Sequence, residues 1–226
     1  MKKLKSLSVI LMLIAVFVAA GCSDSKETDM TKKNSEKNEN SANLKNKPTV
    51  TNEGEKKEIS TEKSNVEWVG KKVTGEHNGT VDITNGEIFV DENEVTGGSF
   101  EIDFTTIKVL DIEDAESNTK LTNHLKSEDF FASDKHPKGK FNITSVSKVS
   151  GDKYNVTGDL SIKGISKEIT FPAVIKISDG IVTATADFEI DRTLWDIQYR
   201  SGKFFENLGD KLISDNFQIK FNITTL

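Results

Sequence analysis

The chain has 226 residues, of which 35% are hydrophobic and 29% are charged, and its formal net charge is −6. This length is enough for one hydrophobic core of ordinary size. The chain holds a single cysteine, which excludes an intrachain disulfide. The acidic balance argues against nucleic acid or an anionic bilayer surface as an electrostatic partner of the folded part.

Residues 1–21 have the pattern of a secretory signal peptide. Three lysines within the first five residues precede a continuous apolar run from Leu7 to Ala20, which is too short for a membrane span. The small residues before Cys22 resemble a bacterial lipobox. We therefore expect Cys22 to be lipidated and to anchor the protein in a membrane of the bacterial envelope, facing the periplasm or the cell surface. Ordinary signal cleavage with a spare thiol is the alternative.

Residues 22–58 are predicted to be a polar tether. They are rich in Lys, Asn, Glu, Ser and Thr and bury too little apolar surface to offset the entropy lost on ordering. They hold eight acidic residues and eight lysines. When these and the three lysines of the signal are taken from the totals of 30 basic and 36 acidic residues, 19 basic and 28 acidic residues remain. The predicted folded domain, residues 59–226, is therefore about nine charges negative.

The sequence from Ile59 onward predicts an all-β domain. Apolar and polar residues alternate in successive segments, as expected for strands with one buried face. Asn85-Gly86 is interpreted as a turn or bulge, and Gly97-Gly98 as a break before the strand that holds Phe100. The pattern gives about eight strands.

One short helix is predicted between these strands, over residues 114–126. Ala115, Leu121 and Leu125 have helical spacing, and several acidic residues surround the expected N-terminus. Phe130 and Phe131 follow the helix in a polar neighbourhood. We expect this aromatic pair to close or line one end of the fold.

Two architectures satisfy the strand pattern, a sandwich of two sheets and a closed barrel. Short links between sequential strands favour an up-and-down barrel, which has no exposed edges. An eight-stranded barrel has an interior that side chains fill or that holds one small ligand. The inward face mixes phenylalanines with small residues such as Gly158 and Ala184. This mixture indicates either tight packing or a slot for a ligand.

Four stretches together resemble the YceI-like family. These are Trp68 with His77-Asn78-Gly79, HLKSEDFFASDKHPKGKF at residues 124–141, VTGDLSIKGISKEITFP at 156–172, and DRTLWDI at 191–197. The resemblance covers about residues 59–226. It implies an eight-stranded, antiparallel, lipocalin-like β-barrel of the bacterial envelope that binds polyisoprenoid or related long-chain lipids in a tubular cavity.

A long hydrocarbon needs only a dry tube lined by apolar groups, and its burial contributes about 25 cal/mol per Å². An ordinary filled core is the alternative. The residues that we expect to line the cavity are Phe100, Ile102, Phe104, Phe130, Phe131, Phe141, Ile143, Val156, Leu160, Ile162, Phe188, Trp195, Phe217, Ile219 and Phe221.

The segment from Arg192 to Asn216 is long for a link between two strands. It contains Arg192 and Arg200, the only arginines in a chain with 28 lysines. A guanidinium suits a carboxylate or phosphate headgroup, so Arg200, and with lower priority Arg192, are candidate headgroup contacts, together with His124 on the helix. The alternative is a structural ion pair with Asp191, Asp196 or Asp210.

Other chemistry has little support in the sequence. The three histidines are far apart and lack the spacing of metal ligands. No nucleophile, base and orienting acid can be assembled, so we expect a lipid-binding protein that is not an enzyme and has no metal or cofactor. The expected partners are the lipid ligand and the anchoring membrane, with a homodimer as a further option. A filled barrel that serves in envelope stress or protein interaction is the alternative function.

Overall fold

The computed structural model of the protein describes residues 50–226. The predicted signal peptide, Cys22 and most of the predicted tether lie outside the described residues. No helix in the described part is both long and apolar enough to cross a membrane. The elements are β1 (Glu55–Glu58), β2 (Asn65–Lys72), β3 (Gly75–Asp91), β4 (Glu94–Val109), α1 (Ala115–Lys126), β5 (Lys138–Ser150), β6 (Lys153–Ile162), β7 (Ile165–Ser178), β8 (Ile181–Asp191) and β9 (Ile213–Thr224), with short 3-10 helices at Arg192–Trp195 and Gly209–Lys211.

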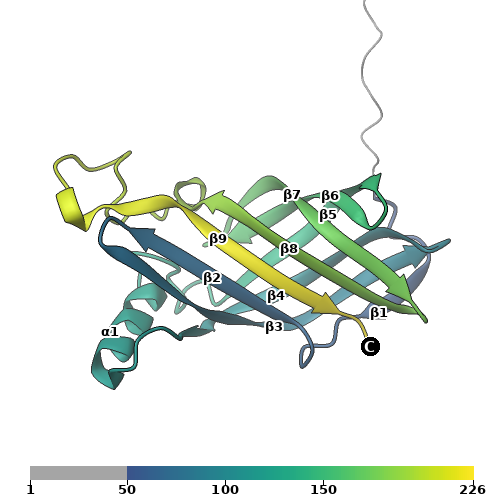
Figure 1. Ribbon diagram of the computed structural model, residues 1–226, viewed down its shortest axis with the longest axis horizontal. Coiled ribbons are helices and arrows are strands. Elements are labelled where there is room, and N and C mark those ends of the chain that lie inside the picture. The colour runs from purple at the N-terminus through teal and green to yellow at the C-terminus, as the bar shows by residue number, and fades with distance from the viewer. Residues whose placement is uncertain (1–49) are drawn as a thin grey trace, which may run out of the picture. The chain divides into compact units, whose positions relative to one another are not determined.

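The strands form one closed antiparallel barrel (Figure 1). Neighbouring strands follow the order β3-β2-β9-β8-β7-β6-β5-β4, and pairing of β3 with β4 closes the ring. The short β1 pairs with the later half of β3, and Ile59 then bridges Thr225 just after β9. Strands β1 and β2 therefore pair with different halves of β3 and together fill one strand position of the barrel. The predicted all-β, eight-stranded antiparallel barrel with one helix is confirmed.

The alternation seen in the sequence becomes an inner and an outer face. In β7, Phe171, Ala173 and Ile175 are buried while Pro172 and Val174 between them are exposed. Within residues 50–226, the buried core is one continuous cluster that includes residues from β2 to β9. Each strand therefore stabilises the barrel through a single apolar face.

The turn between β3 and β4 differs from the prediction. It lies at Glu92 and Asn93, whose φ angles are 45° and 68°. Strand β4 continues through Gly97 and Gly98, with a shift of register between Val95 and Gly97. Two successive positive φ angles match the right-handed twist of a hairpin, and asparagine tolerates this conformation. The predicted break at Gly97-Gly98 is therefore wrong. The pairing of β3 shifts register at Asn85, so the predicted turn or bulge at Asn85-Gly86 is a bulge.

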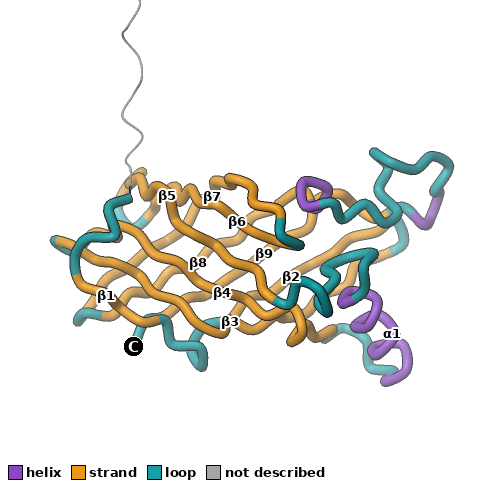
Figure 2. The backbone as a smooth tube through the Cα atoms, turned by 180° about the vertical axis from the view of Figure 1, so that it is seen from behind, coloured by secondary structure: helices purple, strands orange, loops and turns teal. Residues whose placement is uncertain are grey.

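Helix α1 begins at Ala115, one residue after the predicted start. Asp114 is its N-cap and accepts a hydrogen bond from Ser117 N at 2.9 Å. Leu125 is buried against the barrel. Figures 1 and 2 both place α1 and the β8–β9 loop at one end of the barrel and the C-terminus at the other.

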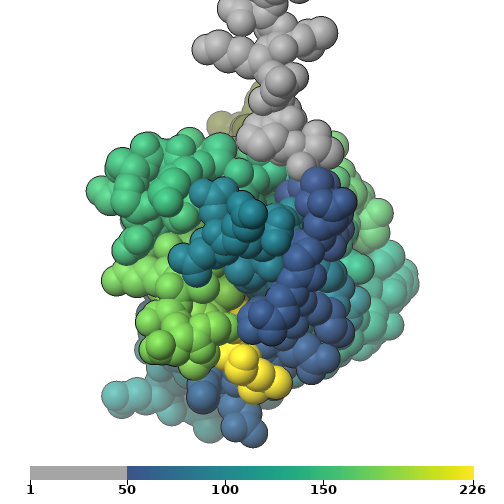
Figure 3. Space-filling view, turned by 90° about the vertical axis from the view of Figure 1, so that its right-hand side faces the viewer, coloured from purple at the N-terminus to yellow at the C-terminus, as the bar shows by residue number. Residues whose placement is uncertain are grey.

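The start of the described chain belongs to the barrel. Val50 N donates to Thr144 O, and Thr51 N donates to Thr96 O, both at 3.3 Å. Figure 3 views this end, where residues from the start of the described chain lie close to the C-terminal residues, drawn in yellow. The predicted boundary at Ile59 therefore falls just after β1, and residues 50–58 are part of the barrel domain.

Candidate functional site

Three apolar cavities lie inside the barrel. The central cavity has a volume of about 70 Å³ and is lined by Val66, Trp68, Val81, Phe100, Ile102, Phe104, Ile107, Phe131, Phe141, Leu160, Ile162, Ile169, Phe171, Phe188, Phe217, Ile219 and Phe221. A second, the α1-end cavity, also of about 70 Å³, is lined by Trp68, Gly70, Leu125, Phe130, Phe131, Arg192, Ile197, Ile213, Ser214 and Phe217. A third, the far cavity, of about 40 Å³, is lined by Ile88, Val95, Phe100, Phe141, Ile143, Val146, Val156, Phe171, Ala173, Ile175, Val182, Ala184, Phe221 and Ile223.

The shared walls of these cavities define their order. Trp68, Phe131 and Phe217 line both the central and the α1-end cavity. The central and far cavities share four phenylalanines, whereas the α1-end and far cavities have no lining residue in common within residues 50–226. The central cavity therefore lies between the other two, and aromatic rings separate them.

The phenylalanines around the central cavity form a continuous chain of ring contacts. The Phe171 and Phe188 rings stack with centroids 4.2 Å apart, and Phe141 lies 5.5 Å from both Phe171 and Phe100. Such pairs contribute roughly 0.5–1.5 kcal/mol each beyond their buried area. The contacts are apolar, so the rings can rearrange without leaving a hydrogen-bonding group unpaired.

Glycines allow several of these rings to lie against the barrel wall. A Cβ atom on Gly158 would come within 2.3 Å of Phe141 Cζ, and one on Gly139 within 2.9 Å of Phe104 Cζ. A Cβ atom on Gly79 would similarly lie 2.6 Å from Cζ2 of Trp68. The small residues of the inward face thus make room for rings that lie across neighbouring strands.

Most of the predicted lining residues lie on a cavity wall. Trp195 is the exception, because its fully buried ring lines none of the three cavities and its Nε1 donates to Leu160 O at 3.0 Å. The central cavity also has six lining residues that the prediction omitted, although the same alternation could have identified them in their strands: Val66, Trp68, Val81, Ile107, Ile169 and Phe171.

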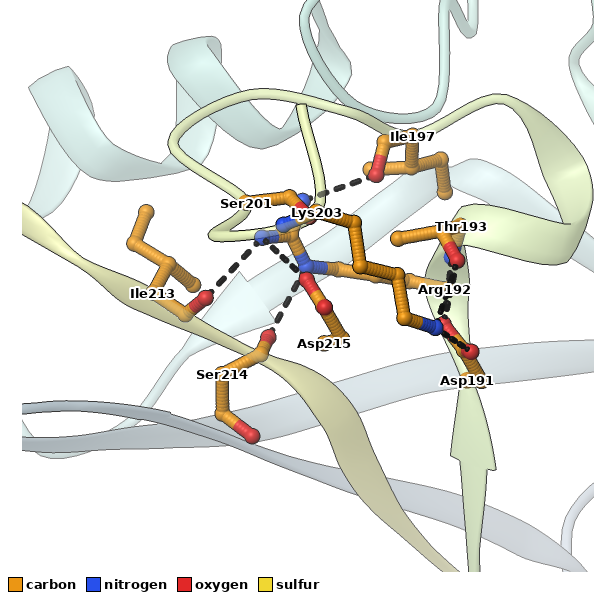
Figure 4. A network of polar contacts seen from close by, with 9 residues as sticks. All are labelled: Asp191, Arg192, Thr193, Ile197, Ser201, Lys203, Ile213, Ser214 and Asp215. Carbon is orange, nitrogen blue, oxygen red and sulfur yellow. Dashed lines mark hydrogen bonds and ion pairs between the residues drawn. The ribbon is translucent and has the colours of Figure 1, made fainter. Parts of the chain in front are cut away.

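Arg192 is buried and lines the α1-end cavity. Figure 4 shows the polar contacts around its guanidinium. Its side chain is 4% exposed, and its guanidinium donates to Ser214 O at 2.9 Å, Ile197 O at 2.8 Å and Ile213 O at 3.2 Å. The Asp215 carboxylate lies 3.6 Å from Nη2. Burial lowers the pKa of Arg192 from its ordinary value. These bonds tie both ends of the β8–β9 loop together and use three of the five guanidinium N–H donors.

The partner of Arg192 differs from those predicted. Its ion pair is with Asp215, not with Asp191, Asp196 or Asp210. Asp191 instead pairs with Lys203 and accepts hydrogen bonds from Thr193 N and Oγ1. Burial of Asp191 raises its pKa, but the hydrogen bonds from Lys203 and Thr193 outweigh this effect and hold the pKa below its usual range.

His124 and Arg200 belong to an aromatic cluster between α1 and the loop. The His124 ring packs edge-on against Phe130 at 5.0 Å and Tyr199 at 4.7 Å, while its Nε2 lies 2.9 Å from Asp129 Oδ2. The Arg200 guanidinium lies 5.0 Å from the centre of the Tyr199 ring. Neither His124 nor Arg200 lines the cavities described above, so a headgroup contact by either residue stays a prediction.

The described residues contain no group of three His, Cys, Asp or Glu side chains placed to hold a metal ion. The central and far cavities are lined by hydrocarbon and aromatic groups, and the α1-end cavity adds Arg192 and Ser214 to such groups. Such a lining recognises an apolar molecule by shape and by burial of surface.

Comparison with known proteins agrees with this architecture. The family model for the YceI-like domain matches residues 58–225. The UPF0312 protein plu2095 of Photorhabdus laumondii is 38% identical over 68 residues, which cover 30% of this chain and 34% of that protein. The chain spans less than half the length of the curated relatives that it matches first.

Solved structures share the fold at low sequence identity. Burkholderia cenocepacia BcnA is 22% identical with a TM-score of 0.61, and the match covers 74% of this chain and 99% of BcnA. A polyisoprenoid binding domain from Saccharophagus degradans is 11% identical with a TM-score of 0.57, covering 74% of this chain and 96% of that domain. Because the family model matches residues 58–225, which are most of the chain, the chain belongs to the YceI-like domain family.

Proposed function

We propose that this protein binds an isoprenoid or another long-chain amphiphilic lipid inside its barrel and catalyses no reaction on it. The observation that carries the proposal is the row of three apolar cavities along the barrel, whose shared lining residues are all aromatic. A similar fold in the polyisoprenoid binding domain from Saccharophagus degradans supports it.

Binding of a long chain requires the cavities to join. Volumes of about 70, 70 and 40 Å³ are each well below the roughly 300–1,000 Å³ of typical ligand pockets. Movement of the shared rings would open one continuous tube, and no hydrogen bond between these rings opposes it. The ligand would then replace ring contacts by its own apolar contacts at about 25 cal/mol per Å² buried.

The α1 end is the proposed entrance. There the central and α1-end cavities are separated by Trp68, Phe131 and Phe217. Phe131 lies in the segment between α1 and β5, outside the strand ladder, and its ring stacks on Phe104 at 4.6 Å. A side chain on a connecting segment can move without breaking the pairing of strands.

The place of action that we propose is a membrane of the bacterial envelope, where lipidated Cys22 holds the barrel through the polar tether. A lipid-binding domain held there could exchange ligand with the bilayer. Changing Cys22 to Ser should move the protein from the membrane fraction to the soluble fraction and remove the mass of the covalent lipid. An unchanged mass and distribution would exclude the anchor.

The alternative function is a filled barrel that acts through protein contacts, and the small cavity volumes favour it. Native mass spectrometry of the full chain from a bacterial host, followed by organic extraction of non-covalent ligand, separates the two. A bound long-chain lipid in a one-to-one ratio supports lipid binding. A protein that is isolated empty and takes up neither polyprenyl lipids nor fatty acids would establish the filled barrel instead.

A further inference from the structure

The two tryptophans of the chain differ in the state of their indole N–H groups. Nε1 of Trp195 donates to Leu160 O at 3.0 Å. Nε1 of Trp68 is buried and has no hydrogen-bond acceptor within residues 50–226. A donor that is removed from water and left without an acceptor destabilises the structure that contains it, and buried tryptophan N–H groups usually have a partner. The indole N–H of Trp68 is therefore available to donate a hydrogen bond to a ligand.

Trp68 lies where a bound chain would pass. Its side chain lines both the central and the α1-end cavity. The indole lies across the wall over Gly79, the residue directly opposite it on β3, and a side chain at that position would collide with Cε2, the atom bonded to Nε1. A ligand that occupies both cavities would thus lie beside the indole.

The surroundings favour a neutral acceptor over an anion. Apart from Trp68, the central cavity is lined entirely by aliphatic residues and phenylalanine. The arginine beside the α1-end cavity is already engaged by three carbonyl oxygens and Asp215. A phosphate or carboxylate beside Trp68 would lose its hydration without gaining a free cation, which costs far more than burying a carbonyl, ether or hydroxyl group that is hydrogen-bonded.

We propose that Trp68 donates a hydrogen bond from Nε1 to a neutral oxygen of the bound lipid, and that this bond selects oxygen-bearing lipids over hydrocarbons of the same length. The inference rests on the proposed lipid-binding function and narrows its ligand class. The polar atom of the ligand then lies at the junction of the two cavities, with the apolar chain in the central and far cavities.

The test compares three probes on the full chain: geranylgeraniol, the isoprenoid hydrocarbon of the same length, and geranylgeranyl phosphate. Wild-type protein should prefer the alcohol to the hydrocarbon by about three- to tenfold, the range of one net hydrogen bond, and should bind the phosphate more weakly than the alcohol. Trp68→Phe keeps an aromatic ring and removes the donor, so it should abolish this preference while hydrocarbon affinity changes little.

Phe217→Leu is the matched control, because Phe217 lines the same two cavities and has no donor. It should change alcohol and hydrocarbon affinity by the same factor. An independent readout is the pair of indole N–H signals in the ¹H–¹⁵N spectrum. The alcohol should move the Trp68 signal downfield and leave the Trp195 signal in place.

Each contrary result would contradict a different part of the proposal. If Trp68→Phe keeps the preference for the alcohol, or lowers both affinities equally, Trp68 only packs against the ligand and the inference fails alone. Tighter binding of the phosphate than of the alcohol overturns the neutral-oxygen assignment. If the wild-type protein binds none of the probes, the proposed function fails and this inference fails with it.

Discussion

The barrel interior and the β8–β9 loop are held together by different forces. In the interior, phenylalanine rings contact one another at centroid distances of 4.2 to 6.2 Å. In the loop, one buried guanidinium binds three carbonyl groups and lies beside Asp215. The first region depends on contact area, whereas the second depends on direction and charge.

This difference indicates which part of the molecule can change shape. Rings can turn and exchange one apolar contact for another at small cost. Moving the loop would instead leave a buried charge and several carbonyl groups without partners, which is expensive. We therefore expect the loop to fix the end of the barrel while the interior adapts to a ligand.

Replacing Arg192 by Met should have the largest effect. The substitution leaves three carbonyl groups and Asp215 without their partner, so the free energy of unfolding should fall by about 3–5 kcal/mol. Urea denaturation followed by circular dichroism measures it. Arg200→Met is the control, because Arg200 lies over Tyr199 and its loss should cost about 1 kcal/mol or less. Equal losses in both variants would contradict the special role of Arg192.

Adding a methyl group at Gly158 tests the packing of the rings. The new Cβ would lie 2.3 Å from Phe141 Cζ and 2.5 Å from Asn142 O, so Gly158→Ala should destabilise the protein by roughly 1–3 kcal/mol. Gly70→Ala should change stability by only about 0.5 kcal/mol, because nothing lies within 4 Å of that Cβ position. A neutral Gly158→Ala variant would show that both the Phe141 ring and the backbone at Asn142 can shift freely.

Phe131→Ala removes the ring and should join the central and α1-end cavities. The loss of stacking on Phe104 and of part of its buried area should cost about 1–2 kcal/mol. Uptake of a fluorescent long-chain alcohol, followed by stopped flow, should be several-fold faster than in the wild type. Phe130→Ala serves as the comparison, since Phe130 lines only the α1-end cavity of the three; the same acceleration there would argue against Phe131 as the barrier.

The smallest expected effect is a pH dependence at Asp191. Because the folded-state pKa of Asp191 is lowered, the charged carboxylate stabilises the fold above its unfolded pKa of about 4. That contribution is lost as the pH falls through the still lower folded pKa. Unfolding free energies of the wild type and Asp191→Asn should therefore differ at pH 7 and converge toward pH 2.5. A constant difference would mean that the carboxylate charge does not stabilise the loop.

The sequence predicted the strands well because each strand is half buried, so that burial repeats every second residue. It predicted the wrong break in β4 because Gly97-Gly98 is a strong turn signal, whereas the turn itself uses Glu92 and Asn93. Trp195 was taken for a cavity residue because a large aromatic side chain in a long loop carries no sign of the direction in which it packs.

What the sequence determined by itself is therefore the barrel, its apolar inner face and the helix before β5. Only the tertiary structure decided that Trp195 has an acceptor and that Trp68 has none among residues 50–226. It also decided that Arg192 meets Asp215 and that glycines receive the rings of Phe141 and Phe104. The physical reason is the distance along the chain over which each feature is determined. Periodicity depends on neighbours in the chain, whereas a hydrogen bond or a cavity depends on atoms that distant segments bring together.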